Sequence, residues 1–118
     1  MKLKAIIATA VVTAAAGFAA TGASAAGQAD TTLVLKNNGG DFYGKVKSPD
    51  PVNCLEDRQV KVYEIVGGGQ LDYVASDSTD SNGKWNTGNN GADPGDYVAK
   101  VKATTYCQSD KSNVVEVN

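Results

Sequence analysis

Short segments in which apolar and polar residues alternate occupy most of the chain after residue 30. A period of two is typical of β-strands with one buried face, whereas amphipathic helices repeat apolar residues every three or four positions. No helical repeat is seen after the N-terminal region, and glycine, asparagine, aspartate and serine separate the alternating segments. The pattern predicts seven strands, at residues 31–36, 41–48, 58–65, 71–77, 83–87, 96–103 and 113–118.

The phase of the alternation predicts which side chains face the core. In the clearest strand, Tyr97, Ala99 and Val101 share one face, and Lys100 and Lys102 share the other. The inward residues of the other strands are Leu33, Leu35, Phe42, Gly44, Val46, Val60, Val62, Val74, Trp85, Val115 and Val117. Because a single sheet would leave its apolar face in water, we expect an all-β sandwich of two antiparallel sheets. We also expect the Tyr97 hydroxyl to donate to a backbone acceptor, as in a tyrosine corner.

Turn signals lie between the expected strands. Asn82-Gly83 predicts a type I′ hairpin turn, which needs positive φ at both central residues. Asp93-Pro94-Gly95-Asp96 predicts a type II turn, and the glycines of residues 66–70 predict the tip of a hairpin. Residues 48–57 contain two prolines, which lack a backbone donor, so this segment is expected to be a loop.

The segment around Asn82-Gly83 has a second interpretation. Oxygen-bearing side chains on alternate residues, followed by a glycine, approximate the spacing of a calcium-binding loop. In that register Ser78 stands where an aspartate is wanted, Asp77 is out of phase, and an asparagine replaces the bidentate glutamate. The sequence therefore favours a turn, with a weak calcium site at Asp77, Asp80 and Asn82 as the alternative, and no metal or other cofactor is expected.

The N-terminus has the form of a secretory signal peptide. Lys2 and Lys4 make the first residues positively charged, and residues 5–22 carry no charge. Ala23-Ser24-Ala25 then supplies the small residues that signal peptidase requires. Cleavage after Ala25 divides the chain into a signal peptide, 1–25, and one domain, 26–118; cleavage after Ala26 is a close alternative. The mature protein is expected to be secreted and extracellular, with no membrane insertion after cleavage.

The size and net charge of the mature domain limit its possible ligands and its stability. The whole chain has a formal net charge of −2, and cleavage removes two lysines and no acidic residue, so the mature domain carries −4. An acidic protein is poorly suited to nucleic acid, whose binding depends on cationic contacts with phosphates. A domain of this length buries only about 60–65% of its unfolded surface and is marginally stable without further support. We expect a monomer.

Two cysteines remain after cleavage, in an oxidising compartment. They predict a Cys54–Cys107 disulfide. On the chain-entropy model, closing a loop of this length stabilises the folded protein by about 4 kcal/mol. The chain contains no histidine, which excludes Ser-His-Asp and Cys-His catalysis and removes the commonest metal ligand. The candidate carboxylate pairs, Asp93 with Asp96 and Glu56 with Asp57, lie at turns, where water keeps them ionised, so the protein is not expected to be an enzyme.

Outward tyrosines and lysines form the candidate ligand surface: Tyr43, Tyr63, Tyr73, Lys45 and Lys47. The tyrosines have the amphipathic rings that stack on sugars or contact proteins, although singly scattered surface tyrosines are the simpler interpretation.

Two outward lysine pairs raise a further possibility. Lys45 and Lys47 would form one basic stripe with Lys100 and Lys102 if their strands shared a sheet, and this stripe would suit acidic glycans. Lysines on outward strand faces also prevent sheets from pairing edge to edge, which is the competing explanation.

The motifs STDSNGKW and PGDYVAKV, preceded by FYGKV, resemble the pattern of transthyretin-like, or carboxypeptidase regulatory-like, domains. The order of motifs over about residues 40–117 is similar to small exported actinobacterial proteins of uncharacterised function. The resemblance implies a seven-stranded Greek-key β-sandwich of the transthyretin-like (prealbumin-like) kind, used as an accessory or adhesive module. Related pilin-type modules carry a lysine–asparagine crosslink, which would here join Lys36 to Asn113 or Asn118, but the promoting glutamate is missing from the expected turn.

Together these features predict a secreted, non-catalytic β-sandwich that binds an unknown extracellular or cell-envelope partner. The alternatives are a structural or matrix component without a discrete ligand, and a carbohydrate-binding module that uses the outward tyrosines.

Overall fold

The computed structural model describes residues 27–118, so the expected signal peptide, 1–25, lies outside the described residues. The described elements are β1 (Thr32–Asn38), β2 (Asp41–Lys47), α1 (Pro51–Cys54), β3 (Gln59–Val66), η1 (Gly67–Gly69), β4 (Gln70–Ser78), β5 (Lys84–Asn89), β6 (Gly95–Val101), β7 (Asp110–Lys111) and β8 (Val115–Val117). Within this range no helix is long and apolar enough to cross a membrane.

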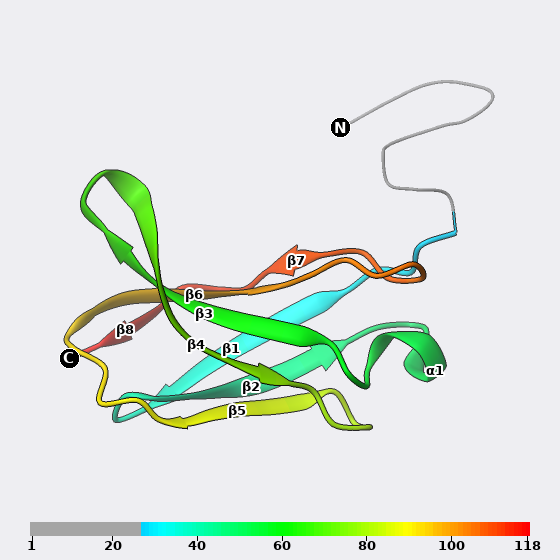
Figure 1. The fold of residues 1–118 in the computed structure, drawn as a ribbon, viewed down its shortest axis with the longest axis horizontal. Coiled ribbons are helices and arrows are strands. Elements are labelled where there is room, and N and C mark those ends of the chain that lie inside the picture. Colours follow the sequence, from blue (N-terminus) through cyan, green and yellow to red (C-terminus); the bar gives the residue numbers. More distant parts are fainter. Residues whose placement is uncertain (1–26) are drawn as a thin grey trace.

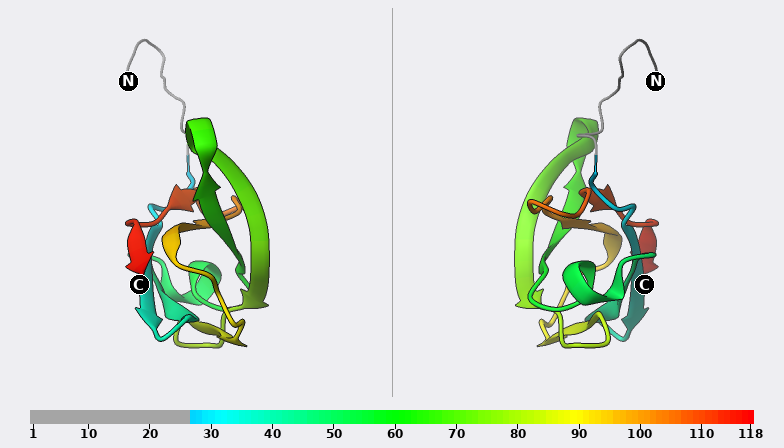
Figure 2. Two further views of the ribbon diagram at one scale, coloured as in Figure 1. Left: turned by 90° about the vertical axis from the view of Figure 1, so that its left-hand side faces the viewer. Right: turned by 90° about the vertical axis from the view of Figure 1, so that its right-hand side faces the viewer.

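The strands form two antiparallel sheets that pack face to face (Figure 1, Figure 2). One sheet has the order β1-β2-β5. The other has the order β4-β3-β6, with β7 and β8 pairing with successive parts of the free edge of β6. The hairpin of β3 and β4 extends beyond the sandwich, with η1 at its tip (Figure 1). The all-β sandwich expected from the alternation is confirmed, whereas the Greek-key connectivity and the transthyretin-like assignment stay predictions.

Each of the seven expected segments contains a strand, but the described residues form eight strands, so the predicted count of seven is not confirmed. The structure adds three short elements that the pattern did not predict: β7, α1 and η1. β7 is only two residues long, too short for any alternation to show. The segment 48–57, expected as loop, contains α1. The Asp50 carboxylate accepts a hydrogen bond from the backbone N–H of Asn53 at 3.2 Å, and Pro51 takes the first helical position. An aspartate N-cap followed by proline is a helix-start signal, so the sequence did carry this information.

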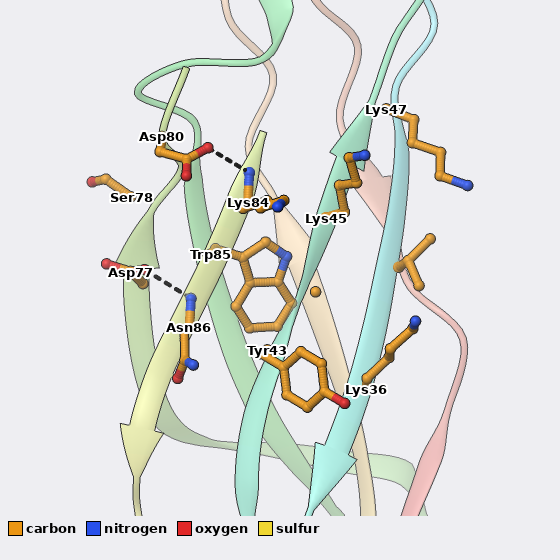
Figure 3. A pocket seen from close by; sticks show the side chains of 12 residues that line it. Lys36, Tyr43, Lys45, Lys47, Asp77, Ser78, Asp80, Lys84, Trp85 and Asn86 are labelled. Carbon is orange, nitrogen blue, oxygen red and sulfur yellow. Dashed lines mark hydrogen bonds between the residues drawn. The ribbon is translucent and has the colours of Figure 1, made fainter. Parts of the chain in front are cut away.

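The turn between β4 and β5 is a hairpin, as expected, but not of the expected type. Asp80 O accepts a hydrogen bond from Gly83 N–H, and Asp80 N–H donates to Lys84 O, each at 2.9 Å. Gly83 has a φ of 81°, whereas Asn82 has a negative φ, so the type I′ assignment is wrong. A three-residue loop with a glycine at its end fits these bonds. The Asp80 carboxylate accepts hydrogen bonds from the N–H groups of Asn82 and Lys84, which stabilises this form of the turn. Figure 3 shows the bond to Lys84.

The turn before β6 also differs from its expected type. Gly95 has a φ of 156°, far from the value of about 80° that a type II turn requires. Gly95 instead begins β6 and pairs with Val117 of β8. The chain is already extended at this position, so no tight turn is needed.

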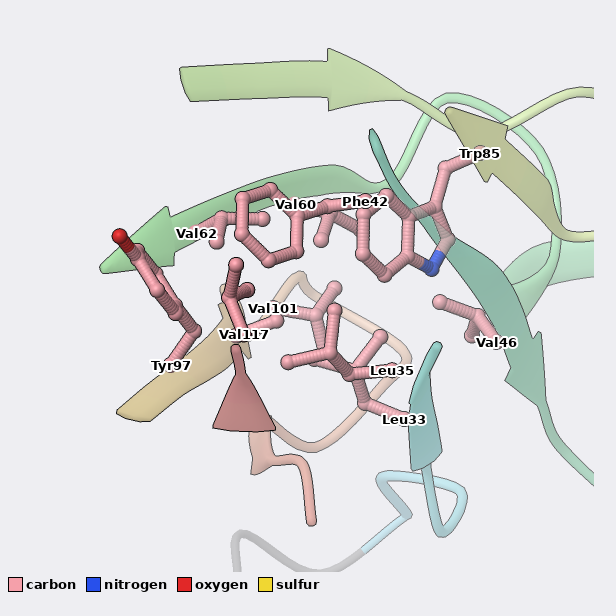
Figure 4. Close-up of a cluster of buried hydrophobic side chains, with 11 residues drawn as sticks. Leu33, Leu35, Phe42, Val46, Val60, Val62, Trp85, Tyr97, Val101 and Val117 are labelled. Atoms are coloured by element: carbon pink, nitrogen blue, oxygen red, sulfur yellow. The ribbon is translucent and has the colours of Figure 1, made fainter. Parts of the chain in front are cut away.

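The core lies between the two sheets and is made by the inward residues that the alternation predicted (Figure 4). The rings of Phe42 and Tyr97 lie 4.8 Å apart between centroids, and the Trp85 side chain is buried. The expected tyrosine corner is confirmed, because the Tyr97 hydroxyl donates to Asp93 O at 2.6 Å. Burial raises the pKa of Tyr97, and the nearby negative charges of Glu64 and Asp93 raise it further.

Side chains cover both free edges of the β1-β2-β5 sheet. At the β1 edge, the Leu33 N–H donates to the Asp110 carboxylate at 2.8 Å, and the Asn113 amide bonds to the backbone of Leu35. At the β5 edge, the Asn86 N–H donates to the Asp77 carboxylate at 2.9 Å. An open edge is a template for pairing with another chain, so these bonds close two sites of edge-to-edge association.

A buried disulfide and a buried arginine hold one end of the sandwich together. The predicted Cys54–Cys107 bond is confirmed, with both cysteines fully buried and their Cα atoms 5.7 Å apart. Beside it, the Arg58 guanidinium is 1% exposed. Its nitrogens donate to the Thr31 hydroxyl and to three carbonyl oxygens, those of Cys54, Lys102 and Gln108. Burial lowers the pKa of this guanidinium. The pattern of apolar and polar residues did not indicate that this arginine would be buried.

Candidate functional site

A groove of about 780 Å³ lies on the outer face of the β1-β2-β5 sheet (Figure 3). Its polar lining includes Lys36 of β1; Tyr43, Lys45 and Lys47 of β2; and Lys84 and Asn86 of β5. The sheet positions them because each is the outward neighbour of an inward core residue. Three adjacent strands therefore present their outward side chains on one surface, which we call the lysine–tyrosine face.

The strand register brings these side chains together. Lys36 lies directly opposite Tyr43, and Tyr43 lies opposite Asn86, so the tyrosine is at the centre of a three-strand row. In the next outward row, Lys45 lies directly opposite Lys84. Directly opposed residues on one face have Cβ atoms about 5 Å apart, so two lysines at such a site repel each other.

Two acids, Asp77 and Asp80, also line the groove, but neither carboxylate forms an ion pair with a lysine of this face. In residues 27–118 no lysine ammonium has a carboxylate oxygen within ion-pair distance. Asp80 already accepts two backbone hydrogen bonds. Those bonds, to Lys84 N–H and then Asn82 N–H, are the largest causes that lower its pKa, and the charges of Lys84 and Lys45 lower it further. The four lysines thus remain available for an external anion.

A glycine fixes the backbone beneath the groove. A Cβ at Gly44 would lie 1.9 Å from the carbonyl oxygen of Val34 and 3.0 Å from the Trp85 ring. Only a residue without a side chain permits β1 and β2 to approach this closely while the indole fills the space below. The outward residues on either side of Gly44 are Tyr43 and Lys45, so the same packing holds both in place.

The structure divides the predicted ligand surface into two. Tyr43, Lys45 and Lys47 lie on the lysine–tyrosine face, and Lys36 and Lys84 join them there, which the sequence reasoning missed. Tyr63 and Tyr73 lie on the outer face of the other sheet, with ring centroids 6.2 Å apart. The proposed stripe of Lys45 and Lys47 with Lys100 and Lys102 is wrong, because β2 and β6 belong to different sheets.

The alternative chemistries find little support in the geometry. The carboxylates of Asp77 and Asp80 accept backbone N–H groups, and within residues 27–118 no three acidic or cysteine side chains are grouped to hold a metal ion. For the crosslink, Asn113 bonds to the Leu35 backbone, whereas Lys36 lines the outer groove.

Comparison with protein-family models, with curated proteins and with solved structures finds no match for this chain. The function is therefore inferred from the residues of the site itself.

Proposed function

We propose that the mature chain is a secreted, non-catalytic binding domain, and that it binds acidic polysaccharides through the lysine–tyrosine face. The observation that carries the proposal is the arrangement around Tyr43. Lys36 lies directly opposite Tyr43, Lys45 and Lys84 are directly opposed in the next outward row, and Lys47 follows one row further along β2 (Figure 3). None of these four lysines forms an ion pair within residues 27–118.

The chemistry of an acidic polysaccharide matches this arrangement. A sugar ring can stack on the half-buried phenol of Tyr43, and its carboxylates can reach the ammonium groups at either side. Each exposed ion pair contributes only about 0–1 kcal/mol, so useful affinity requires several contacts along one polymer. The negative net charge does not prevent this, because at physiological ionic strength charges beyond about 8 Å are largely screened.

Two further features support an extracellular setting. The N-terminal segment has the features of a signal peptide, and the disulfide is the kind that persists in oxidising compartments. The all-β sandwich is also compatible with the proposed transthyretin-like family, whose members include accessory and adhesive modules. Fold resemblance alone does not specify a ligand, which is why the proposal rests on the face.

Affinity measurements with polygalacturonate test the proposal, with dextran as an uncharged polysaccharide and polyglutamate as a polyanion without sugar rings. We expect binding to polygalacturonate that weakens as salt rises, weaker binding to polyglutamate and none to dextran. Equal affinity for the two polyanions would remove the role of Tyr43 in stacking. Absence of binding to polygalacturonate at low salt would contradict the proposal.

Matched variants locate the site. Lys45→Ser and Lys84→Ser should each weaken binding, whereas Lys102→Ser changes the charge equally at an exposed position outside the groove and should not. In the same way, Tyr43→Ala should weaken binding, whereas Tyr106→Ala removes an exposed loop tyrosine and should have no effect.

A further inference from the structure

We propose that the domain has a second polyanion-binding face on its opposite side and bridges two polysaccharide chains. The inference rests on the proposed function, since it assigns the same class of ligand to a second site. The second site is the outer face of the β4-β3-β6 sheet with β7, and we call it the opposite face.

A row of three lysines crosses this face. Lys61 of β3 lies directly opposite Lys100 of β6, and Lys100 lies directly opposite Lys111 of β7. Directly opposed like charges destabilise a sheet. No carboxylate of residues 27–118 forms an ion pair with any of the three. The repulsion thus recurs on the second sheet, and here it extends over three strands.

Aromatic side chains lie in the next outward row, as they do on the lysine–tyrosine face. Tyr63 and Tyr73 are directly opposed and meet edge to face, and the Lys100 ammonium lies 5.7 Å from the centroid of the Tyr63 ring. Val98, the partner of Tyr63 on β6, points away from the main core yet is only 2% exposed. Tyr73 is 59% exposed, which leaves its ring open to a ligand.

The two faces cannot share one polymer segment. They are the outer surfaces of two sheets packed face to face, so they point in opposite directions (Figure 2). Packed sheets lie about 10 Å apart, which exceeds the screening distance of about 8 Å at physiological salt, so the faces act independently. One bound chain on each side would make the domain a cross-bridge.

Light scattering during titration of polygalacturonate with the mature protein tests the inference. A bridging domain should produce scattering that rises to a maximum and then falls at excess protein, when each polymer is saturated and no free site remains to bridge. The protein alone must not scatter under the same conditions. Binding without a scattering maximum would overturn the inference while leaving the proposed function intact, whereas absence of any binding would overturn both.

Variants of each face separate bridging from charge neutralisation. Lys61→Ser with Lys100→Ser, and separately Lys45→Ser with Lys84→Ser, should each abolish the maximum, while the remaining face still binds polymer. A variant with one intact face should lose avidity for a long polymer by at least about tenfold. Tyr73→Ser gives a second test of the opposite face at a side chain that is largely exposed. Lys102→Ser, which changes charge outside both rows, should retain the maximum; persistence of the maximum in either double variant would overturn the inference.

Discussion

The side-chain amide of Asn113 accepts a hydrogen bond from the backbone N–H of Leu35 and donates one to its carbonyl oxygen, each at 3.0 Å. It thereby acts as the neighbour that β1 lacks on this edge, from a residue 78 positions further along the chain. Asn113→Ala would leave both backbone groups without a partner. We expect a loss of about 2 kcal/mol in the free energy of unfolding, because each unpaired group costs about 1–3 kcal/mol where it is buried and less where water reaches it.

Urea denaturation measures this loss, and Asn118→Ala, at the exposed C-terminus, is the matched control. Asn113→Asp keeps the acceptor and removes the donor, so it should fall between the wild type and Asn113→Ala. If Asn113→Ala and Asn118→Ala were equally stable, the edge bonds would have no energetic role.

Arg58→Met should be among the most destabilising substitutions in the domain. The methionine fills similar space but leaves the carbonyl oxygens of Cys54, Lys102 and Gln108 without donors. We expect a loss of at least about 3 kcal/mol, since hydrogen bonds to charged groups contribute about 1.5–3 kcal/mol each. Arg58→Lys should recover only part of this, because an ammonium cannot reproduce the fork of the guanidinium. Thermal unfolding followed by circular dichroism checks this order of stabilities. If Arg58→Met lost no more stability than Lys102→Met, the hydrogen bonds of Arg58 would contribute nothing to the free energy of unfolding.

Gly44→Ala should disrupt the pairing of β1 with β2. The new Cβ would meet the Val34 carbonyl oxygen at 1.9 Å, a contact that only a shift of the backbone can relieve. We expect a loss of about 3 kcal/mol or more, in the range of severe steric conflicts in a core. Gly67→Ala is the control, because its Cβ would have no neighbour within 4 Å and its φ is not positive. Equal urea midpoints for the two variants would contradict the close approach of the strands.

Tyr97→Phe should lower stability at neutral pH by about 1 kcal/mol, through loss of the hydroxyl bond to Asp93 O. The pKa of Tyr97 is raised above 10.0 in the folded protein. Its contribution to stability is therefore complete below pH 10.0 and is lost as the pH rises through the folded-state pKa. The difference in urea midpoint between wild type and Tyr97→Phe should shrink above pH 10.0. A difference that stays constant with pH would mean that the hydroxyl does not titrate as its buried position requires.

The sequence predicted those features that depend on neighbouring residues in the chain. Alternation placed the strands and their inward side chains, and the disulfide followed from two cysteines that have only one possible pairing. The tyrosine corner was predicted because Tyr97 and its acceptor, Asp93, are only four residues apart. The turn between β4 and β5 was placed correctly, but its type depends on how the Asp80 carboxylate bonds to the backbone, which a dipeptide signal does not show.

Features that depend on strand order escaped sequence analysis. Lys36 and Lys84 join Tyr43 only because β1 and β5 lie on either side of β2. The same cause separates Tyr63 from Tyr43, although both point outward from their strands. Arg58 was missed for another reason. Arginine is rarely fully buried, and the carbonyl groups that satisfy it come from segments up to 50 residues away.

Amide chemical-shift mapping of the ¹⁵N-labelled mature protein with short oligogalacturonates shows directly whether acidic sugars bind at the lysine–tyrosine face. We expect the shifts of the lysine–tyrosine face to be among the largest, at Lys36, Tyr43, Lys45 and Lys84, and to weaken with added salt. Shifts confined to α1 and to the tip of the β3–β4 hairpin, or no shifts at any ligand concentration, would contradict it.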